Sequence, residues 1–264
     1  MIGSLIDLKG KSSSDLGQRM LNTVASQSIR HLFTSSEFID VDIQCNPPSK
    51  LLQGTIDSFK MKGRELLIRR AFAVKEMSFE TDAVSVDTSA LLSGRLQIKQ
   101  PTQAVAQVIL TEEAINKAFE ADLVQQHLQG VDAEALTNLS GGEPISFRDV
   151  QVELSSSNQV SISALTDLPN RQRVPVEILA TLAVERRRRV VFNDAIFNEE
   201  KVPQELQGIS GILSNGFITV LNSMVDLDRF NLDGIVMRIN RLETQGKTLV
   251  FSGYAQIEHF PSSG

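Results

Sequence analysis

Residues 174–185 read Val-Pro-Val-Glu-Ile-Leu-Ala-Thr-Leu-Ala-Val-Glu. Every second residue of this stretch, beginning with Val174, is apolar, while Glu177, Thr181 and Glu185 lie between them. Because successive side chains of a strand point to opposite faces, the stretch predicts a strand with one buried face and one solvent-facing side. At about 3.3 Å per residue it would run roughly 40 Å, which is long for a strand. The fold is therefore expected to contain a long strand that covers a large apolar core.

Apolar and polar residues also alternate on both sides of this stretch, which predicts further strands. These lie near residues 38–45, 54–63, 66–80, 83–87, 95–99, 103–110, 145–154, 160–165, 190–197, 232–241 and 248–257. Short turn signals separate them, and Thr-Gln-Gly-Lys at 244–247 is typical of a hairpin turn. The strands do not alternate regularly with helices, as a parallel sheet requires, so we expect antiparallel pairing.

Three segments follow the helical period instead. The first runs from about residue 15 to 33. The second begins after Thr111, a good N-cap, and ends by Gly130, while the third follows Pro203. Glycine inside a helix costs about 1 kcal/mol relative to alanine, so a close neighbour, either a sheet or a lipid chain, is expected where the third helix carries three of them. These are Gly208, Gly211 and Gly216.

The totals favour one domain. The chain has 264 residues, of which 41% are hydrophobic, and no linker rich in proline, glycine or serine divides it. We expect a single α+β domain over residues 1–264, with residues 1–12 as a disordered N-terminal segment. The first residues lack the pattern of a signal peptide, and no apolar stretch approaches the roughly 20 residues of a spanning helix. A cytoplasmic location is therefore expected.

Charge and aromatic content argue against nucleic acid as a partner. With 26 basic and 32 acidic residues the formal net charge is −6, so the whole molecule weakly repels polyanions. Tryptophan is absent and Tyr254 is the single tyrosine, which leaves few rings for stacking on bases. The single cysteine, Cys45, excludes an internal disulfide.

No motif nominates a catalytic residue, a metal ligand or a cofactor. The three histidines are far apart in sequence, and none has a partner at metal-ligand spacing. The sequence around Ser210 resembles a nucleophile elbow superficially, but Ile212 stands where that motif needs glycine. We expect no enzyme activity, no catalytic residue and no metal.

Four consecutive arginines, Arg186, Arg187, Arg188 and Arg189, lie between two predicted strands. They would form an exposed hairpin tip with four positive charges on an acidic molecule. Anionic lipid headgroups attract such a cluster by about 1 kcal/mol per residue. The alternative is a charged edge that only protects the sheet from pairing with other chains.

Several motifs together resemble the LmeA-type phospholipid-binding family of bacterial domains. Residues 41–54 combine an alternating strand with Pro-Pro and Leu-Leu-x-Gly, and residues 84–94 join Val-Ser-Val-Asp to Leu-Leu-Ser-Gly. An alternating strand then runs into Leu-Thr-Glu at 104–112, and Leu-Asp-x-Phe-x-Leu-x-Gly closes the pattern at 227–234. The order and spacing of these motifs carry the resemblance, which covers most of the chain.

The resemblance implies a fold similar to the tubular lipid-binding superfamily, in which a long, highly curved antiparallel sheet wraps around α-helices. It also implies an elongated apolar cavity that takes phospholipid or fatty acid as a ligand, without cofactor or catalysis. Envelope members of the family carry a signal peptide or an anchor. Because none is recognised here, peripheral contact with anionic membrane is expected at the inner face of a membrane.

Periodicity alone selects candidate lining positions for such a cavity, on the long strand and on the second and third helices. They are Val176, Ile178, Leu182, Val184, Phe119, Leu123, Ile209, Leu213, Phe217 and Leu221. The simpler interpretation is that these residues cover one another in an ordinary core. Our first hypothesis is a phospholipid carrier or sensor, and the alternative is a protein-binding scaffold with a fully packed core. A third hypothesis is a lipid-modifying hydrolase that uses Ser210 or another serine, although no motif places a suitable base nearby.

Overall fold

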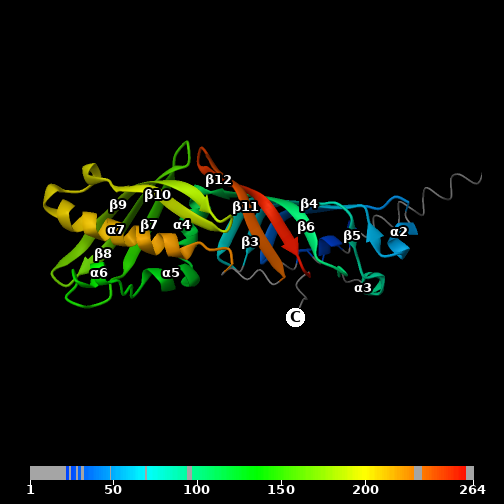
Figure 1. Cartoon of the computed structure of the whole chain (residues 1–264), viewed down its shortest axis with the longest axis horizontal. Coiled ribbons are helices and arrows are strands. Elements are labelled where there is room, and N and C mark those ends of the chain that lie inside the picture. The colour runs from blue at the N-terminus through cyan, green and yellow to red at the C-terminus, as the bar shows by residue number, and fades with distance from the viewer. Residues whose placement is uncertain are drawn as a thin grey trace, which may run out of the picture.

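The computed structural model describes residues 22–23, 25–27, 29–30, 33–47, 49–68, 70–93, 97–228 and 234–259. Antiparallel strands dominate this part of the chain and form two main sheets, which lie one after the other along an elongated molecule (Figure 1). The predicted α+β class and the antiparallel pairing are confirmed.

The larger sheet has six strands in the order β1-β3-β4-β6-β12-β11. Their bounds are Ser35–Gln44 for β1, Ser58–Ile68 for β3, Phe72–Thr81 for β4, Thr102–Thr111 for β6, Ile235–Gln245 for β11 and Thr248–Ile257 for β12. The C-terminal hairpin thus joins a sheet begun by the first strands. Its predicted turn is confirmed, since β11 and β12 are joined through Gly246 and Lys247.

The smaller sheet has four strands in the order β10-β9-β8-β7. They are β7 (Phe147–Leu154), β8 (Gln159–Leu168), β9 (Arg171–Glu185) and β10 (Arg189–Phe197), and α7 (Gln207–Met224) packs against β9 and β10. The predicted long strand is confirmed as β9, which has 15 residues. Its side chains Val174, Val176, Ile178, Ala180 and Leu182 are all buried.

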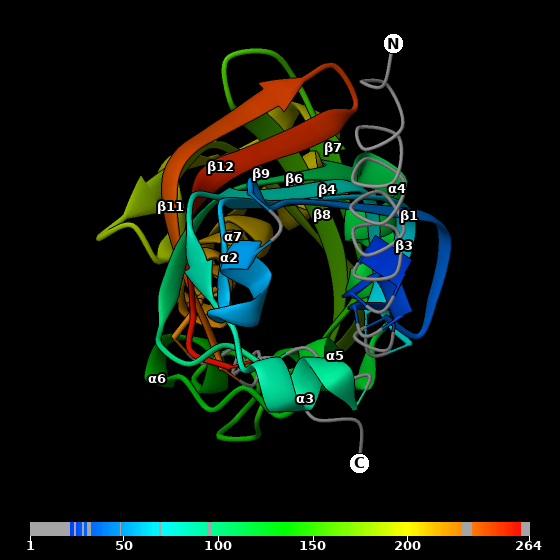
Figure 2. The same cartoon turned by 90° about the vertical axis from the view of Figure 1, so that its right-hand side faces the viewer.

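Two short pieces of strand cover the far end of the six-stranded sheet. These are β2 (Thr55–Ile56) and β5 (Val84–Ser85), which pair with each other and are flanked by the short helices α2 (Ser49–Leu52) and α3 (Thr88–Leu92). Figure 2 looks along the molecule from this end and shows β11 and β12 on one side of the view, with β1 and β3 on the other. We call β2, β5, α2 and α3 the end cap.

The core has two parts. One lies between α7, the four-stranded sheet and the near end of β11 and β12, and includes Leu213, Phe217 and Leu249. The other lies under the end cap and includes Ile43, Phe59 and Val84. Two open sheets with separate cores replace the single continuous sheet that was expected. The reason is that β7 to β10 are joined by tight turns and pair only with one another.

One helix was predicted between Thr111 and Gly130, but the structure has two there, α4 (Glu112–Ala118) and α5 (Asp122–Leu128). The short helix α6 (Glu134–Thr137) follows beyond the predicted end. The predicted N-cap is confirmed, because the Thr111 hydroxyl accepts a hydrogen bond from the Ala114 N–H at 3.0 Å. The first helix ends at Ala118, and Leu123, which was expected on the same apolar stripe, is 51% exposed on α5. Short 3-10 turns, η1 (Glu199–Lys201) and η2 (Gln204–Leu206), precede α7.

Other boundaries differ from the predicted ones. A single strand was expected over 66–80, but β3 ends at Ile68 and β4 begins at Phe72. Arg70 lies in the turn between them with a φ of 61°, a conformation that the sequence does not signal because it is uncommon outside glycine. Of the strand predicted at 95–99, residues 95–96 lie outside the described residues, and Ile98 forms an isolated bridge with Val86. The prediction for residues 1–12 and the start of the helix at 15–33 lie outside them too, but the described residues from 22 to 30 are helical.

Candidate functional site

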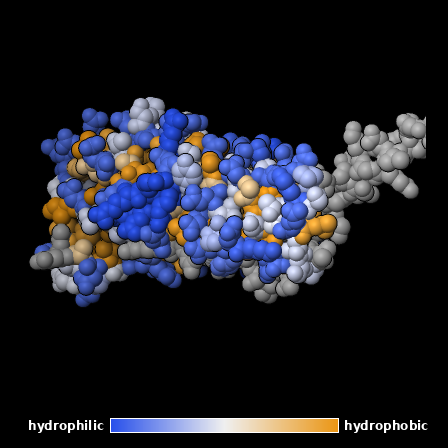
Figure 3. All heavy atoms as spheres, turned by 45° about the vertical axis from the view of Figure 1, so that its right-hand side comes forward, coloured by the Kyte–Doolittle hydropathy of each residue, from blue (hydrophilic) through white to orange (hydrophobic). Residues whose placement is uncertain are grey.

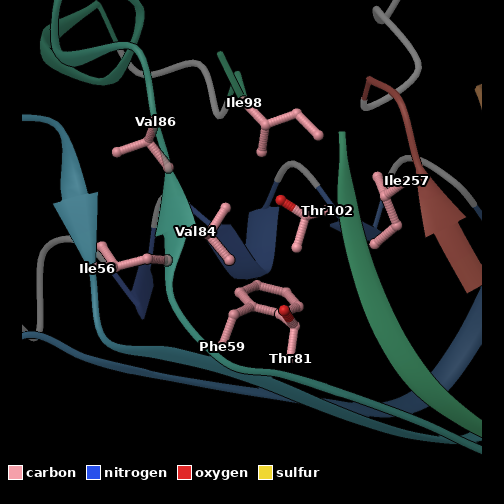
Figure 4. Close-up of a pocket in the computed structure, with 8 residues that line it drawn as sticks. All are labelled: Ile56, Phe59, Thr81, Val84, Val86, Ile98, Thr102 and Ile257. Carbon is pink, nitrogen blue, oxygen red and sulfur yellow. The ribbon is translucent and has the colours of Figure 1, made fainter. Parts of the chain in front are cut away.

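A small pocket lies beneath the end cap (Figure 4). About 10 Å³ of it is open to the centre of a water molecule, which is room for about one water. Its walls come from β2, β3, β4, β5, β6 and β12 and from the bridged segments around residues 86 and 98. The lining residues are Ile56, Phe59, Thr81, Val84, Val86, Ile98, Thr102 and Ile257.

The lining contains no charged side chain. Six of the eight residues are apolar, and the hydroxyls of the two threonines bond to nearby backbone. Thr81 Oγ1 donates to the Asp82 carbonyl and Thr102 Oγ1 to the Gln100 carbonyl, both at 3.4 Å. The pocket therefore offers an apolar ligand a surface without charged side chains.

The roof of the pocket is held by few hydrogen bonds. β2 and β5 pair over two residues each, and the Val86 N–H donates to the Gly54 carbonyl at 2.8 Å. The Lys99 N–H donates to the Ser85 carbonyl, also at 2.8 Å. At Gly54 φ is +76°, and a Cβ there would lie 2.7 Å from the Val86 oxygen, so this turn requires glycine.

α2 is fixed to this roof through Asp57. Lys50 Nζ lies 2.6 Å from Asp57 Oδ1, and the Asn46 N–H donates to Asp57 Oδ2 at 2.6 Å. Both interactions favour the carboxylate, and they hold the pKa of Asp57 below its ordinary value. The link positions α2 beside the pocket.

The apolar surface continues from the pocket along one face of the six-stranded sheet. Phe59 pairs with Thr81 across β3 and β4, and the next positions in that direction include Ala104, which pairs with Ala255. In the neighbouring row Ala106 pairs with Gly253. The small residues Ala104, Ala106 and Ala255 on this face are buried.

The structure brings nine of the ten predicted lining residues together, but at the other end of the molecule. Val176, Ile178, Leu182, Leu213, Phe217 and Leu221 are buried in the core of the four-stranded sheet, and Val184, Phe119 and Ile209 pack against it. Ile178 is 1% exposed, and the rings of Phe147 and Phe217 lie 4.4 Å apart. Leu123 is not part of this group, since it is 51% exposed on α5. The arrangement is that of a packed core, and a lipid-lining role for these residues stays a prediction.

Arg186, Arg187 and Arg188 form the turn of the β9–β10 hairpin and Arg189 begins β10, at the predicted place, but the turn does not project freely into solvent. The Ile239 N–H of β11 donates to the Arg187 carbonyl at 2.7 Å, and the Arg187 guanidinium donates to Asn240 Oδ1 at 2.5 Å. The hairpin is thus docked on the edge of the other sheet.

The arginine side chains also differ from the expected four free charges. Arg188 is half-buried and forms an ion pair with Asp228, and Arg189 is half-buried with its Nη1 2.9 Å from Glu185 Oε2. Arg186 alone of the four has no hydrogen bond or ion pair with the described residues. The expectation of an exposed tip with four charges is wrong for Arg188 and Arg189, and the Arg187 side chain bonds directly to β11 of the other sheet. Contact with lipid headgroups stays a prediction.

Ser210 is fully buried in α7, and its hydroxyl has no hydrogen-bond partner among the described residues. A substrate cannot reach it without opening the core. A close neighbour explains the helix glycine at position 216, because a Cβ there would collide with the Leu136 side chain of α6. Nothing lies within 4 Å of a Cβ at Gly208, so the expected close neighbour is absent at that position.

Within the described ranges no three side chains of His, Cys, Asp or Glu come together as a metal site requires. The same part of the chain contains no helix that combines the length and the apolar character needed to cross a bilayer.

Sequence reasoning missed the pocket because its walls come from six strands and two bridged segments that only the fold brings together. A signal was present in the motif Lys50-Leu51-Leu52-Gln53-Gly54, which recurs loosely as Ala90-Leu91-Leu92-Ser93-Gly94. The two copies include the C-terminal residues of α2 and α3, the two helices of the end cap. The repeated turn therefore marked the segment that covers the pocket.

Comparison with curated proteins found no match, and comparison with solved structures found none either. A family model described as LmeA-like phospholipid-binding matches residues 13–253, which include the four-stranded sheet, the end cap, α7 and the six-stranded sheet up to Gly253 of β12. The match extends over most of the 264 residues, so the resemblance drawn from the motifs is confirmed. The chain belongs to the LmeA-like phospholipid-binding family.

Proposed function

We propose that this protein binds phospholipid without catalysis and acts as a lipid carrier, with acyl chains held against the inner face of the six-stranded sheet. The chains enter at the pocket beneath the end cap. In this proposal the sheet curves around the bound chains. The observation that carries the proposal is the lining of the pocket, in which apolar side chains meet without any charged group. Membership of a phospholipid-binding family supports the same ligand.

The pocket has to widen to take an acyl chain, because it now has room for about one water. The end cap is the part that can move at lowest cost. Its two-stranded sheet contains two residue pairs, whereas the six-stranded sheet beneath it has ladders of up to ten. Separating the cap from the sheet would extend the pocket along β6, past the buried small residues Ala104 and Ala106.

Native mass spectrometry tests the proposal. The purified protein is incubated with phosphatidylcholine vesicles, separated from them and sprayed without denaturant. We expect a species heavier than the chain by one or more phospholipid molecules. If only the bare chain appears after incubation with several phospholipids, the packed scaffold that binds a protein partner becomes the better account.

A matched pair of substitutions tests the position of the site. Thr102 lines the pocket and is half-buried, so Thr102→Phe would fill the entrance with little disturbance of the core. Thr181 is a half-buried threonine on β9 in the other sheet, and Thr181→Phe adds the same volume there. We expect the first variant to lose bound lipid and the second to retain it, with both folded by circular dichroism. Equal lipid content in the two variants would move the site away from this pocket.

A further inference from the structure

We infer that the end cap is the surface by which this protein docks on a phospholipid bilayer, with Leu52 inserted among the lipids. The inference rests on the proposed function, because a carrier has to collect its ligand from a membrane. It assigns the membrane contact to the end of the molecule that carries the pocket, and not to the arginine turn between the sheets.

Leu52 is 82% exposed, far more than a large apolar side chain usually is on a folded domain. It is the last residue of α2, and its neighbour Leu51 packs into the core under the end cap. One leucine therefore anchors the short helix while the next points outward. The Gly54 N–H donates to the Leu51 carbonyl at 3.0 Å, which fixes the turn directly after Leu52.

The surroundings of Leu52 suit the surface of a bilayer. Lys50 is neutralised by its ion pair with Asp57, and Gln53 is exposed beside Leu52. Figure 3 turns this end forward and shows hydrophobic side chains among hydrophilic ones at the tip. Insertion of an apolar side chain needs no net charge on the lipid, and salt does not screen it.

The position of Leu52 connects docking with the pocket. Only three residues separate it from Ile56, which is a wall of the pocket, and Gly54 between them is bonded to Val86, a second wall. A force that draws α2 into the bilayer therefore acts on β2 and on its short pairing with β5. The same contact that holds the protein on the membrane would open the entrance facing the lipids.

The arginine turn lies elsewhere. It joins the β9–β10 hairpin to β11 at the middle of the molecule, and α2 lies at the far end of the six-stranded sheet (Figure 1). A flat bilayer touched by the tip of α2 would be distant from Arg187 and Arg188. The two surfaces also differ in their dependence on salt, which an experiment can use.

The test uses tryptophan as a reporter, since the natural chain contains none. Leu52→Trp places the probe at the tip, and Leu123→Trp places it on α5, where the leucine is 51% exposed. On phosphatidylcholine vesicles we expect the emission of the Leu52→Trp protein to shift to shorter wavelength, in 0.1 M and in 1 M salt alike. The Leu123→Trp protein should keep the emission of the free protein.

Replacing Leu52 by a polar residue should correspondingly weaken binding to vesicles. Leu52→Asn should weaken vesicle binding about 10- to 100-fold, the range set by burying one leucine side chain, and Leu123→Asn should leave it unchanged. The inference is overturned if the Leu52 probe does not respond, or if the Leu123 probe responds equally. It is also overturned if Leu52→Asn changes only the oligomeric state in light scattering without vesicles, which would make a second copy the occupant.

Native mass spectra separate this inference from the proposed function. Suppose that the parent protein carries phospholipid and that Thr102→Phe abolishes this binding, but that the Leu52 probe does not respond to vesicles. The assignment of the lipid to the pocket then holds, and the proposed docking surface is wrong. If no phospholipid is ever bound, the proposed function itself fails.

Discussion

Glu177 shows how one side chain of the long strand β9 opposes the stability of its own fold. Its Oε2 atom is buried and has no hydrogen-bond partner among the described residues. Burial raises the pKa of this carboxyl, while Lys201 lowers it and Glu153 raises it by smaller amounts. A carboxyl whose pKa is raised by folding contributes to the free energy of unfolding. This contribution is fully present below the unfolded pKa and is lost as the pH rises through the folded pKa.

Glu177→Gln is therefore expected to stabilise the protein at pH 7, by less than about 1 kcal/mol because the group is partly exposed to solvent. The gain in stability should vanish near pH 3.5, where the side chain at position 177 is neutral in the parent and in the variant. Thermal denaturation at the two pH values measures it, with the exposed Glu200→Gln as the control. A Glu177→Gln protein that is less stable than the parent at pH 7 would show that the carboxylate has a partner in solution.

At the scale of elements, the two sheets are held together by side chains that reach from one to the other. Asn158 lies at the turn between β7 and β8 and meets β11 with both ends of its amide. Its Nδ2 donates to the Leu242 carbonyl at 3.0 Å, and its Oδ1 accepts from the Thr244 N–H at 2.9 Å. Its own N–H donates to Thr244 Oγ1 at 2.9 Å, and its φ of 61° is one that asparagine tolerates better than most residues.

Two substitutions separate these contributions. Asn158→Gly removes the two amide hydrogen bonds and keeps the backbone conformation free of strain, so it should lower the free energy of unfolding by about 1–3 kcal/mol. Asn158→Ala removes the same bonds and adds about 1–2 kcal/mol for a left-handed backbone. Urea denaturation compares them. If both variants lose the same free energy of unfolding, the turn relaxes once the hydrogen bonds of Asn158 to β11 are removed. If neither variant loses stability, Asn158 does not join the sheets.

Local patterns predicted the elements that depend on neighbouring residues. The alternation around Ile178, the cap at Thr111 and the turn at Gly246 are visible in the sequence because period, capping and turn chemistry act within a few positions. The roles of Arg188 and Asn158 were not visible. Their partners, Asp228 and Thr244, are 40 and 86 residues away along the chain.

At the scale of the whole molecule, two open sheets with separate cores give the protein two different ends. The end that holds α7 is closed by large buried side chains such as Phe217 and Ile178. The other is covered by the end cap over a pocket lined with Phe59 and Val84. The periodicity of the sequence placed the lipid at the α7 end, because the apolar stripes there are the longest in the sequence. It could not reveal the pocket under the end cap, whose walls meet only when β2, β5, β6 and β12 come together.

The central claim is that acyl chains lie at the end-cap side of the molecule. Phe59→Trp puts a single tryptophan in the wall of the pocket, and Phe119→Trp puts one beside the core of the four-stranded sheet. Phospholipid with brominated acyl chains quenches tryptophan fluorescence at short range, so each protein is titrated with it and with the unbrominated lipid.

We predict that brominated lipid quenches the tryptophan fluorescence of the Phe59→Trp protein and does not quench that of the Phe119→Trp protein. Quenching of Phe119→Trp alone would contradict the account and would place the acyl chains against Val176, Leu213 and their neighbours, while quenching of neither would mean that this protein does not enclose acyl chains at either end.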